Sequence, residues 1–422
     1  MSTVLFLCGP SMGDALGAIG RSFAPVLGEL GRKLVTLDLN DPNGPRTLSE
    51  IAAAGPIEFA FSFVGMGAEL EAVAEDGDRK NLWEAWRIPY ISLYGDTPAY
   101  FFDRHVMPAR LCGALYAFPE HADLRKRLPL VPGVIGVSPP GALDAIQESA
   151  IDFRRKESGR LLFLKNGNDP EQLIAEWRRC LPTETFQMLL DVAGALVERM
   201  ARDSTCDIDA TVKDYFAQRN LDVTHAYPLR LFFIAQIDDY LRRVKSNMIT
   251  RVLMDFPVDM FGYNWEHLDF RGKRINFTPG GDYTRSLPMI REALGLIDMS
   301  PNTSLAPHER PLRAFGSYSL CLTNEQAFFQ DNLALASQFM FAFDEESIRA
   351  KVADVIRHPK RYVEIGREAS REFRSKFSPM RFAETLVTTA AALRLAQGDR
   401  PAPLQPYFGW PSDRLLGTPS AR

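Results

Sequence analysis

The feature that most constrains the fold of this chain is a regular alternation of short apolar runs with stretches of helical pattern. In the first third of the sequence, the apolar runs lie at residues 4–8, 33–39, 59–64, 90–94 and 134–137, and each ends in turn-forming residues. Strands separated by helices of this length predict a parallel β-sheet with helices on both faces. Ligands of such sheets bind where the strands end, at the carboxyl edge. We therefore expect the loops after these runs to converge on one site.

The same alternation begins again near residue 160 and predicts a second α/β unit. Its strand-like runs lie at residues 161–164, 258–261, 275–277, 318–322 and 339–343, with a mainly helical region at 170–255. A chain of 422 residues is long enough for two domains. We expect an N-terminal domain at 1–150, a C-terminal domain with a helical insertion at 151–390, and a tail at 391–422. Two Rossmann-like domains of this kind are expected to face a cleft, which is a favoured place for ligands.

Composition narrows the classes of partner and of compartment. The net charge of −4 argues against non-specific nucleic-acid binding as the main activity. The five cysteines are scattered, without a CxxC or Cys/His cluster, so zinc is not predicted and a reducing cytoplasm is expected. No apolar stretch approaches about 20 residues, and the N-terminus has the pattern of a strand, so neither a membrane span nor a signal peptide is predicted.

Residues 300–325, SPNTSLAPHERPLRAFGSYSLCLTNE, combine two features suited to binding phosphate. A helix is predicted to begin near residues 308–311 and to end at Gly316, before a buried strand and a polar loop. A helix N-terminus attracts a diphosphate through its free N–H groups and its partial positive charge. Further groups for a nucleotide-sugar are present nearby: His308, Glu309, Arg310 and Arg313. The alternative is an ordinary helix and strand of a parallel sheet with charged residues at its surface.

The order and spacing of several segments also carry a family likeness. The segments are VDMFGYNW at 258–265, INFTPGGDY at 275–283, LGLIDMSPN at 294–302, HERPLRAFGSYSLCLTNE at 308–325, IRHPKRYVEIGREASREF at 356–373, and IPYISLYGDTPAYF at 88–101. Together they resemble glycosyltransferases of the two-domain GT-B type, in particular the branch related to the spore-maturation protein CgeB. The resemblance implies a C-terminal domain that binds a nucleotide-diphosphate sugar and an N-terminal domain that binds the acceptor. It also implies that protein groups and helix dipoles take the place of a metal ion, and that no separate cofactor is needed.

One departure from that family concerns the mechanism. Many retaining members carry two glutamates eight positions apart, the second five residues before the glycine that corresponds to Gly316. Thr303 and Pro311 occupy those positions here, which slightly favours an inverting mechanism. An inverting enzyme needs a base in its acceptor domain. Asp14 and Asp96, each after a predicted strand, are the candidates, although Asp14 also suits a helix N-cap and Asp96 a turn before proline.

Further residues are expected at the donor site because they follow strands of the second unit. They are Lys165, Asn168, Gly262, Tyr263, Asn264, Thr278, Gly280 and Asn324. Lys165 suits contact with the diphosphate, and the residues around Thr278 and Gly280 suit the nucleotide base. Asn-Gly and Asp-Pro pairs near Lys165 are also ordinary turn formers. Charged residues of the helical region are expected on solvated faces or at a helix start: Asp207, Asp238, Asp239, Arg242, Arg243 and Lys245.

Three functions remain open from the sequence. The first is a glycosyltransferase that moves a sugar from a nucleotide-diphosphate sugar to an acceptor. The second is a sugar-nucleotide epimerase of similar architecture, which needs no acceptor. The third is a non-catalytic module that binds a carbohydrate or a protein partner. A protein side chain, a polysaccharide and a small metabolite are all compatible as acceptor, and nothing indicates the sugar or the base.

Overall fold

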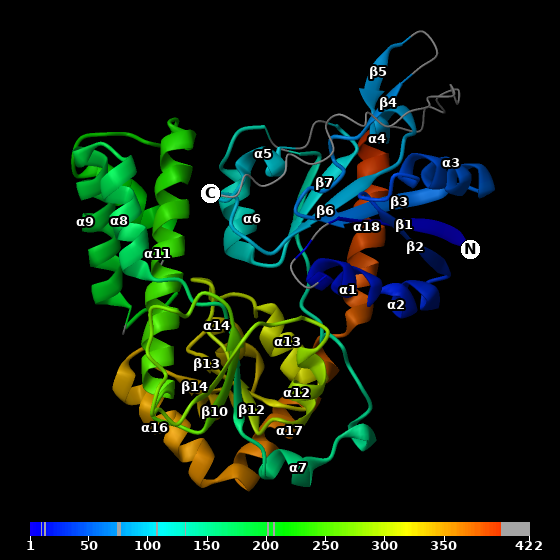
Figure 1. The fold of residues 1–422 in the computed structure, drawn as a ribbon. Coiled ribbons are helices and arrows are strands. Elements are labelled where there is room, and N and C mark those ends of the chain that lie inside the picture. Colours follow the sequence, from blue (N-terminus) through cyan, green and yellow to red (C-terminus); the bar gives the residue numbers. More distant parts are fainter. Residues whose placement is uncertain are drawn as a thin grey trace. The chain divides into compact units, whose positions relative to one another are not determined.

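The computed structural model describes residues 1–397, except residues 10, 12, 13, 74–76, 107, 108, 131, 201 and 206. The chain divides into two compact units (Figure 1). The first consists of Met1–Pro139 together with the segment that begins at Pro379, and the second is Pro140–Ser378. No helix within the described ranges combines the length and the apolar character needed to cross a bilayer.

The described residues of the first unit form a six-stranded parallel sheet with the order β2-β1-β3-β6-β7-β8. Its strands are β1 (Ser2–Cys8), β2 (Arg32–Asp38), β3 (Ile57–Phe63), β6 (Tyr90–Tyr94), β7 (Cys112–Tyr116) and β8 (Val134–Val137). The apolar runs are continuous because the central strands are buried on both faces, as in β1, where Val4 to Leu7 are fully buried. The sequence did not predict β7, whose Cys-Gly-Ala start lacks the β-branched residues typical of strands.

Short helices and one hairpin complete the first unit. They are α1 (Ala15–Arg21), α2 (Ala24–Glu29), α3 (Gly44–Ala54), α4 (Leu82–Ala85), α5 (Phe102–His105), α6 (Pro119–Lys126), and the hairpin of β4 (Glu71–Val73) with β5 (Arg79–Asn81).

Helix α18 (Pro379–Gln397) belongs to the first unit, whereas the sequence predicts residues up to 390 as part of the second domain. Its buried residues join the core under the first sheet, and Phe382 stacks on Phe23 with ring centroids 4.1 Å apart. The predicted boundary differs because helical periodicity reports that a helix has an apolar face, not which sheet the face covers. Beyond Gln397, the predicted tail lies outside the described residues.

The second unit repeats the architecture, with a six-stranded parallel sheet in the order β11-β10-β9-β12-β13-β14 among its described residues. Its strands are β9 (Leu161–Leu164), β10 (Val258–Gly262), β11 (Asn276–Pro279), β12 (Gly295–Ile297), β13 (Leu320–Asn324) and β14 (Met340–Phe341). Its helices outside the insertion are α7 (Phe153–Glu157), α12 (Ser286–Glu292), α13 (Glu309–Gly316), α14 (Ala327–Asn332), α15 (Ala336–Phe339), α16 (Glu345–Arg357) and α17 (Pro359–Lys376), with a 3-10 turn at Glu148–Ala150. The predicted α/β class is confirmed for both units.

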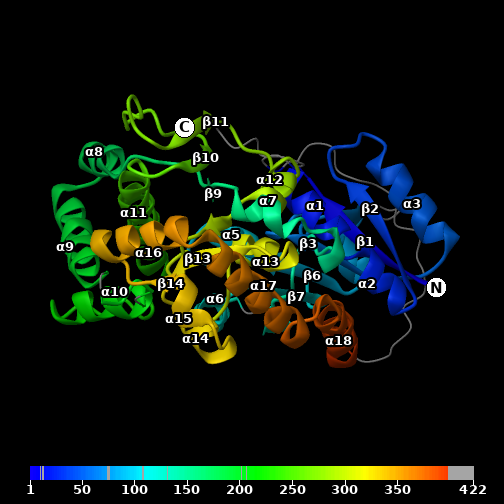
Figure 2. The same cartoon turned by 90° about the horizontal axis from the view of Figure 1, so that it is seen from below.

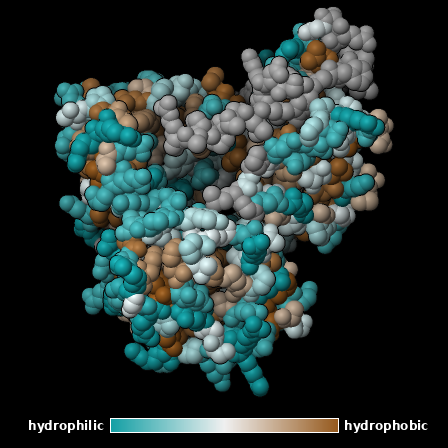
Figure 3. All heavy atoms as spheres, in the orientation of Figure 1, coloured by the Kyte–Doolittle hydropathy of each residue, from teal (hydrophilic) through white to brown (hydrophobic). Residues whose placement is uncertain are grey.

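A helical insertion separates β9 from β10. It consists of α8 (Pro170–Cys180), α9 (Thr183–Arg199), α10 (Ile208–Ala217) and α11 (Tyr227–Leu253), which pack together (Figure 1, Figure 2). On the face drawn in Figure 3, hydrophilic residues cover much of the outer side of α8 and α9. Asp207 caps α10 by accepting a hydrogen bond of 3.0 Å from the Ala210 N–H, so the predicted helix start is confirmed.

Candidate functional site

The loops that follow β9 and β10 are joined at the carboxyl edge of the second sheet. The Lys165 N–H donates to the Phe261 carbonyl at 3.0 Å, and the Trp265 indole donates to the Lys165 carbonyl at 2.8 Å. At Gly262, an added Cβ would lie 1.9 Å from the Lys165 carbonyl oxygen, so this crossing requires glycine. The backbone is thereby fixed on both sides of Lys165.

Neighbouring contacts bring the other predicted loop residues to the same edge. Asn264 adopts a left-handed backbone with φ of 62° and donates from its amide to the Asn168 side chain at 3.0 Å. The Gly280 N–H donates to the Gly262 carbonyl at 2.9 Å, and Thr278 lies opposite Phe261 in the strand ladder. The structure therefore groups these predicted donor residues: Lys165, Asn168, Gly262, Tyr263, Asn264, Thr278 and Gly280.

Helix α13 begins beside the end of β9. His308 is its N-cap residue and does not cap with its side chain, and the helix runs from Glu309. The Arg310 guanidinium donates to the Asp298 carboxylate at 2.6 Å and to the Leu164 carbonyl at 3.0 Å. Asp298 is fully buried, and the Arg310 side chain is 11% exposed. This pair anchors the first turn of α13 next to Lys165. Arg310 is thus held by structural contacts, and binding of a nucleotide-sugar by His308, Glu309 and Arg310 stays a prediction.

Lys165 and His308 have pKa values that are lowered by burial and by neighbouring arginines. Burial and the charges of Arg310 and Arg242 lower the pKa of Lys165 to about 7, while Asp298 and Glu309 oppose the shift. Burial and the charge of Arg310 hold the pKa of His308 well below its usual value, so its ring is neutral at pH 7. A bound anion would relieve the repulsion among the cations, and perturbed groups of this kind gather at functional sites.

Arg313 and Asn324 have structural contacts instead of open positions at this site. The Arg313 side chain is 3% exposed and donates to Asp144 at 3.0 Å, to the Ser286 hydroxyl at 2.9 Å and to the Tyr283 carbonyl at 2.7 Å. Asn324 is fully buried, accepts from the Ser300 N–H at 2.7 Å and donates to the Ser204 hydroxyl at 2.8 Å. These contacts hold α13 and the loop after β12 in place. Arg313 and Asn324 therefore have structural roles, whereas the sequence predicts that they contact the ligand.

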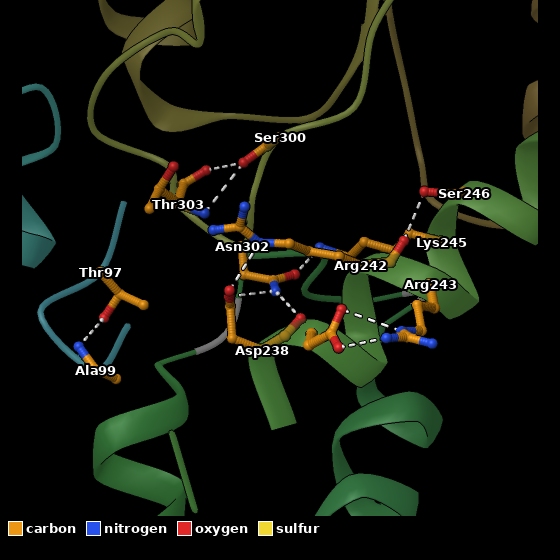
Figure 4. A network of polar contacts seen from close by, with 11 residues as sticks. Thr97, Ala99, Asp238, Arg242, Arg243, Lys245, Ser246, Ser300, Asn302 and Thr303 are labelled. Carbon is orange, nitrogen blue, oxygen red and sulfur yellow. Dashed lines mark hydrogen bonds and ion pairs between the residues drawn. The ribbon is translucent and has the colours of Figure 1, made fainter. Parts of the chain in front are cut away.

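The polar face of α11 is part of this region, and the sequence did not place it there. The prediction of a solvated face is wrong for Asp238 and Lys245, whose exposed fractions are 3% and 2%. Asp238 pairs with Arg242 at 2.7 Å and accepts from the Asn302 amide at 2.7 Å, while Lys245 donates to Asn302 at 2.5 Å (Figure 4). Asp238, Arg242 and Lys245 are spaced four and three residues apart, which places them on one face of α11. The sequence does not show which loop this face contacts, because that depends on packing.

In the first unit, the predicted bases lie at strand ends. Asp14 precedes α1 with a left-handed φ of 53°, makes no side-chain cap hydrogen bond, and forms an ion pair with Arg21. Its loop neighbours 10, 12 and 13 lie outside the described residues. Asp96 follows β6 and is exposed. His105 is buried against Tyr94, and burial lowers its pKa to about 3, which fits a packing histidine.

Among the residues that the structure describes, no three His, Cys, Asp or Glu side chains gather so as to hold a metal ion.

No protein-family model and no curated protein matches the chain. Solved structures do match its fold. A sucrose-phosphate synthase from Thermosynechococcus elongatus aligns over 94% of this chain and 100% of its own, with a TM-score of 0.50 and 8% identity. An alpha-glucosyltransferase, determined in complex with UDP-glucose and DNA containing an abasic site, aligns over 92% and 99%, with a TM-score of 0.52 and 9% identity. The chain has the GT-B fold. At such identities the likeness shows the fold alone, and the CgeB-related branch stays a prediction.

Proposed function

We propose that the protein is a glycosyltransferase and that its second unit binds a nucleotide-diphosphate sugar as donor. The observation that carries the proposal is the position of Lys165 beside the N-terminus of α13, where Arg310 ties the helix to the end of β9. Phosphate groups bind at such helix ends because free N–H groups and the helix dipole both favour negative charge. A neighbour of the same fold was determined with UDP-glucose, which supports a donor of this class.

The chemistry assigns distinct roles to the residues at this edge. When an acceptor oxygen attacks the anomeric carbon, the bond from that carbon to the diphosphate breaks and the diphosphate leaves with its negative charge. Lys165 and the N–H groups of α13 stabilise that charge, and neutral His308 contributes a hydrogen bond. Glu309 accepts hydrogen bonds from donor hydroxyls, while Tyr263, Thr278 and Gly280 contact the base. From the first unit, Asp14 is the proposed base that takes the acceptor proton in an inverting, metal-independent reaction, with Asp96 as the alternative.

A thermal-shift panel of UDP-, GDP-, dTDP- and CMP-sugars tests the proposal. We expect at least one diphosphate donor to raise the melting temperature, because a ligand that binds only the folded state stabilises it. CMP-sugars carry a single phosphate and serve as the control for diphosphate recognition. If no diphosphate donor shifts the melting temperature at millimolar concentration, the second unit is not a donor site. A donor-only incubation that yields an epimer would indicate an epimerase in place of a transferase.

A further inference from the structure

The helical insertion is fastened by α11 to two loops of the proposed donor site. On the loop after β9, the Asn247 amide donates to the Asn168 carbonyl at 3.0 Å, and Arg243 donates to the Asp169 carbonyl at 3.1 Å. On the loop after β12, Asn302 bonds with both Asp238 and Lys245. The polar face of α11 therefore contacts the loops at the edge of the sheet where Lys165 lies.

Arg242 is a cation on this face of α11. It projects from α11 toward the loop that carries Ser300 and Thr303 (Figure 4) and is 20% exposed. Its charge contributes to the lowered pKa values of both Lys165 and His308, so the three groups lie within electrostatic range of one another. Asp238 holds Arg242 in this direction through the ion pair of 2.7 Å.

A buried polar atom on this loop provides independent support. Thr303 is 2% exposed. Its hydroxyl, which can donate to a phosphate oxygen, has no hydrogen-bond partner among the residues described. A buried polar atom without a partner costs about 1–3 kcal/mol, so such atoms in a folded protein call for an explanation, and a polar ligand supplies one.

We propose that Arg242 binds the diphosphate of the nucleotide-sugar, together with Thr303, and that the helical insertion is thereby part of the donor site. This inference rests on the proposed function. An arginine fork matches two phosphate oxygens at once, which a lysine does not do. Lys165 and the N-terminus of α13 bind the diphosphate on the side of the sheet, and Arg242 binds it on the side of the helical insertion.

The test is calorimetric titration of UDP, GDP and dTDP into the full-length protein and its variants. The main variant combines Asp238→Asn with Arg242→Gln, because removing Arg242 alone would leave a buried carboxylate unpaired. We expect its affinity for the best of the three nucleotides to fall about 10- to 150-fold, the range for a charge-assisted hydrogen bond. The matched control is Asp191→Asn with Arg219→Gln, an exposed Asp–Arg pair elsewhere in the insertion, which should leave affinity unchanged.

A milder variant keeps the test decisive if the double variant does not fold. Arg242→Lys retains a cation beside Asp238 but loses the planar fork, and about tenfold weaker binding is expected. Wild-type affinity in a folded Arg242→Lys or double variant, with affinity lost in Lys165→Gln, would overturn the role of Arg242 and leave the donor site standing. If the wild-type protein binds none of the three nucleotides, the donor site and this inference both fail.

Discussion

Lys165 is a titratable residue whose environment has a measurable consequence for ligand binding. Its pKa near 7 means that the free protein carries mostly the neutral amine at pH 8. Burial and the charges of Arg310 and Arg242 lower that pKa, Asp298 and Glu309 raise it, and a bound diphosphate would raise it further. The amine should therefore take up a proton when the donor binds.

The first prediction is that donor affinity is highest below pH 7 and falls as the pH rises above the pKa of free Lys165. The fall should continue until the pKa of the bound form is reached. Calorimetry at pH 8 in two buffers of different ionisation enthalpy measures the proton uptake directly. Lys165→Gln is the control and should show none, and equal enthalpies in both buffers for the wild-type protein would contradict the prediction.

A second prediction separates two neighbouring residues of α13. Arg310→Ala leaves the fully buried Asp298 unpaired, so the free energy of unfolding should fall by about 3–5 kcal/mol. His308→Ala removes a neutral ring that is 26% exposed, so stability should hold while donor affinity falls about 2- to 10-fold. Chemical denaturation and calorimetry measure the two effects, and a stable Arg310→Ala would refute the anchoring role of Arg310.

The third prediction concerns the proposed base. Asp14→Asn should slow transfer by about 10² to 10⁴-fold and leave donor affinity intact, because the amide cannot take a proton. Stability should change little, since the Asp14 side chain makes no cap hydrogen bond and its ion pair with Arg21 is exposed. Steady-state rates with the identified donor measure the loss. An active Asp14→Asn enzyme would transfer the proposed role to Asp96.

At the scale of elements, most strands of the two sheets and the start of α13 could be predicted because local sequence dictates them, whereas β7 and β12 were not predicted. Continuous apolar runs predict buried parallel strands. The polar residues at 308–311 predict the start of α13, and Gly316 predicts its end. The polar face of α11 could not be assigned in this way. Asp238 and Lys245 have the spacing of a solvated face, and only their long-range contacts with Asn302 bury them. Arg313 was likewise predicted to contact a ligand, because its contacts with Asp144 and Ser286 are long-range and cannot be predicted from local sequence.

The fourth prediction tests the crossing between β9 and β10. Gly262→Ala would force a methyl group onto the Lys165 carbonyl, so we expect a loss of about 1–3 kcal/mol in stability together with weaker donor binding. Gly281→Ala is the matched control, since an added Cβ there meets nothing within 4 Å. Denaturant unfolding and donor titration of both variants measure the difference, and equal behaviour would show that the crossing tolerates a side chain.

At the scale of the whole molecule, the described residues form two parallel six-stranded sheets, each with its own core, and this fold matches solved GT-B structures. The alternation of strands and helices predicted the α/β class of both units, and the GT-B type was predicted from the resemblance of the quoted segments. The membership of α18 was not predictable, because its apolar residues Leu386 and Leu393 would suit either sheet. Only their packing under the first sheet assigns the helix to the first unit.

The placement of α18 has a consequence for the order in which the protein matures on the ribosome. The second unit is continuous in sequence, so its core can close as soon as its own segment has emerged. One face of the first sheet instead waits for Leu386, Ala390 and Leu393, which are synthesised only after the whole second unit. The half of the molecule that is translated first is therefore the half that is finished last.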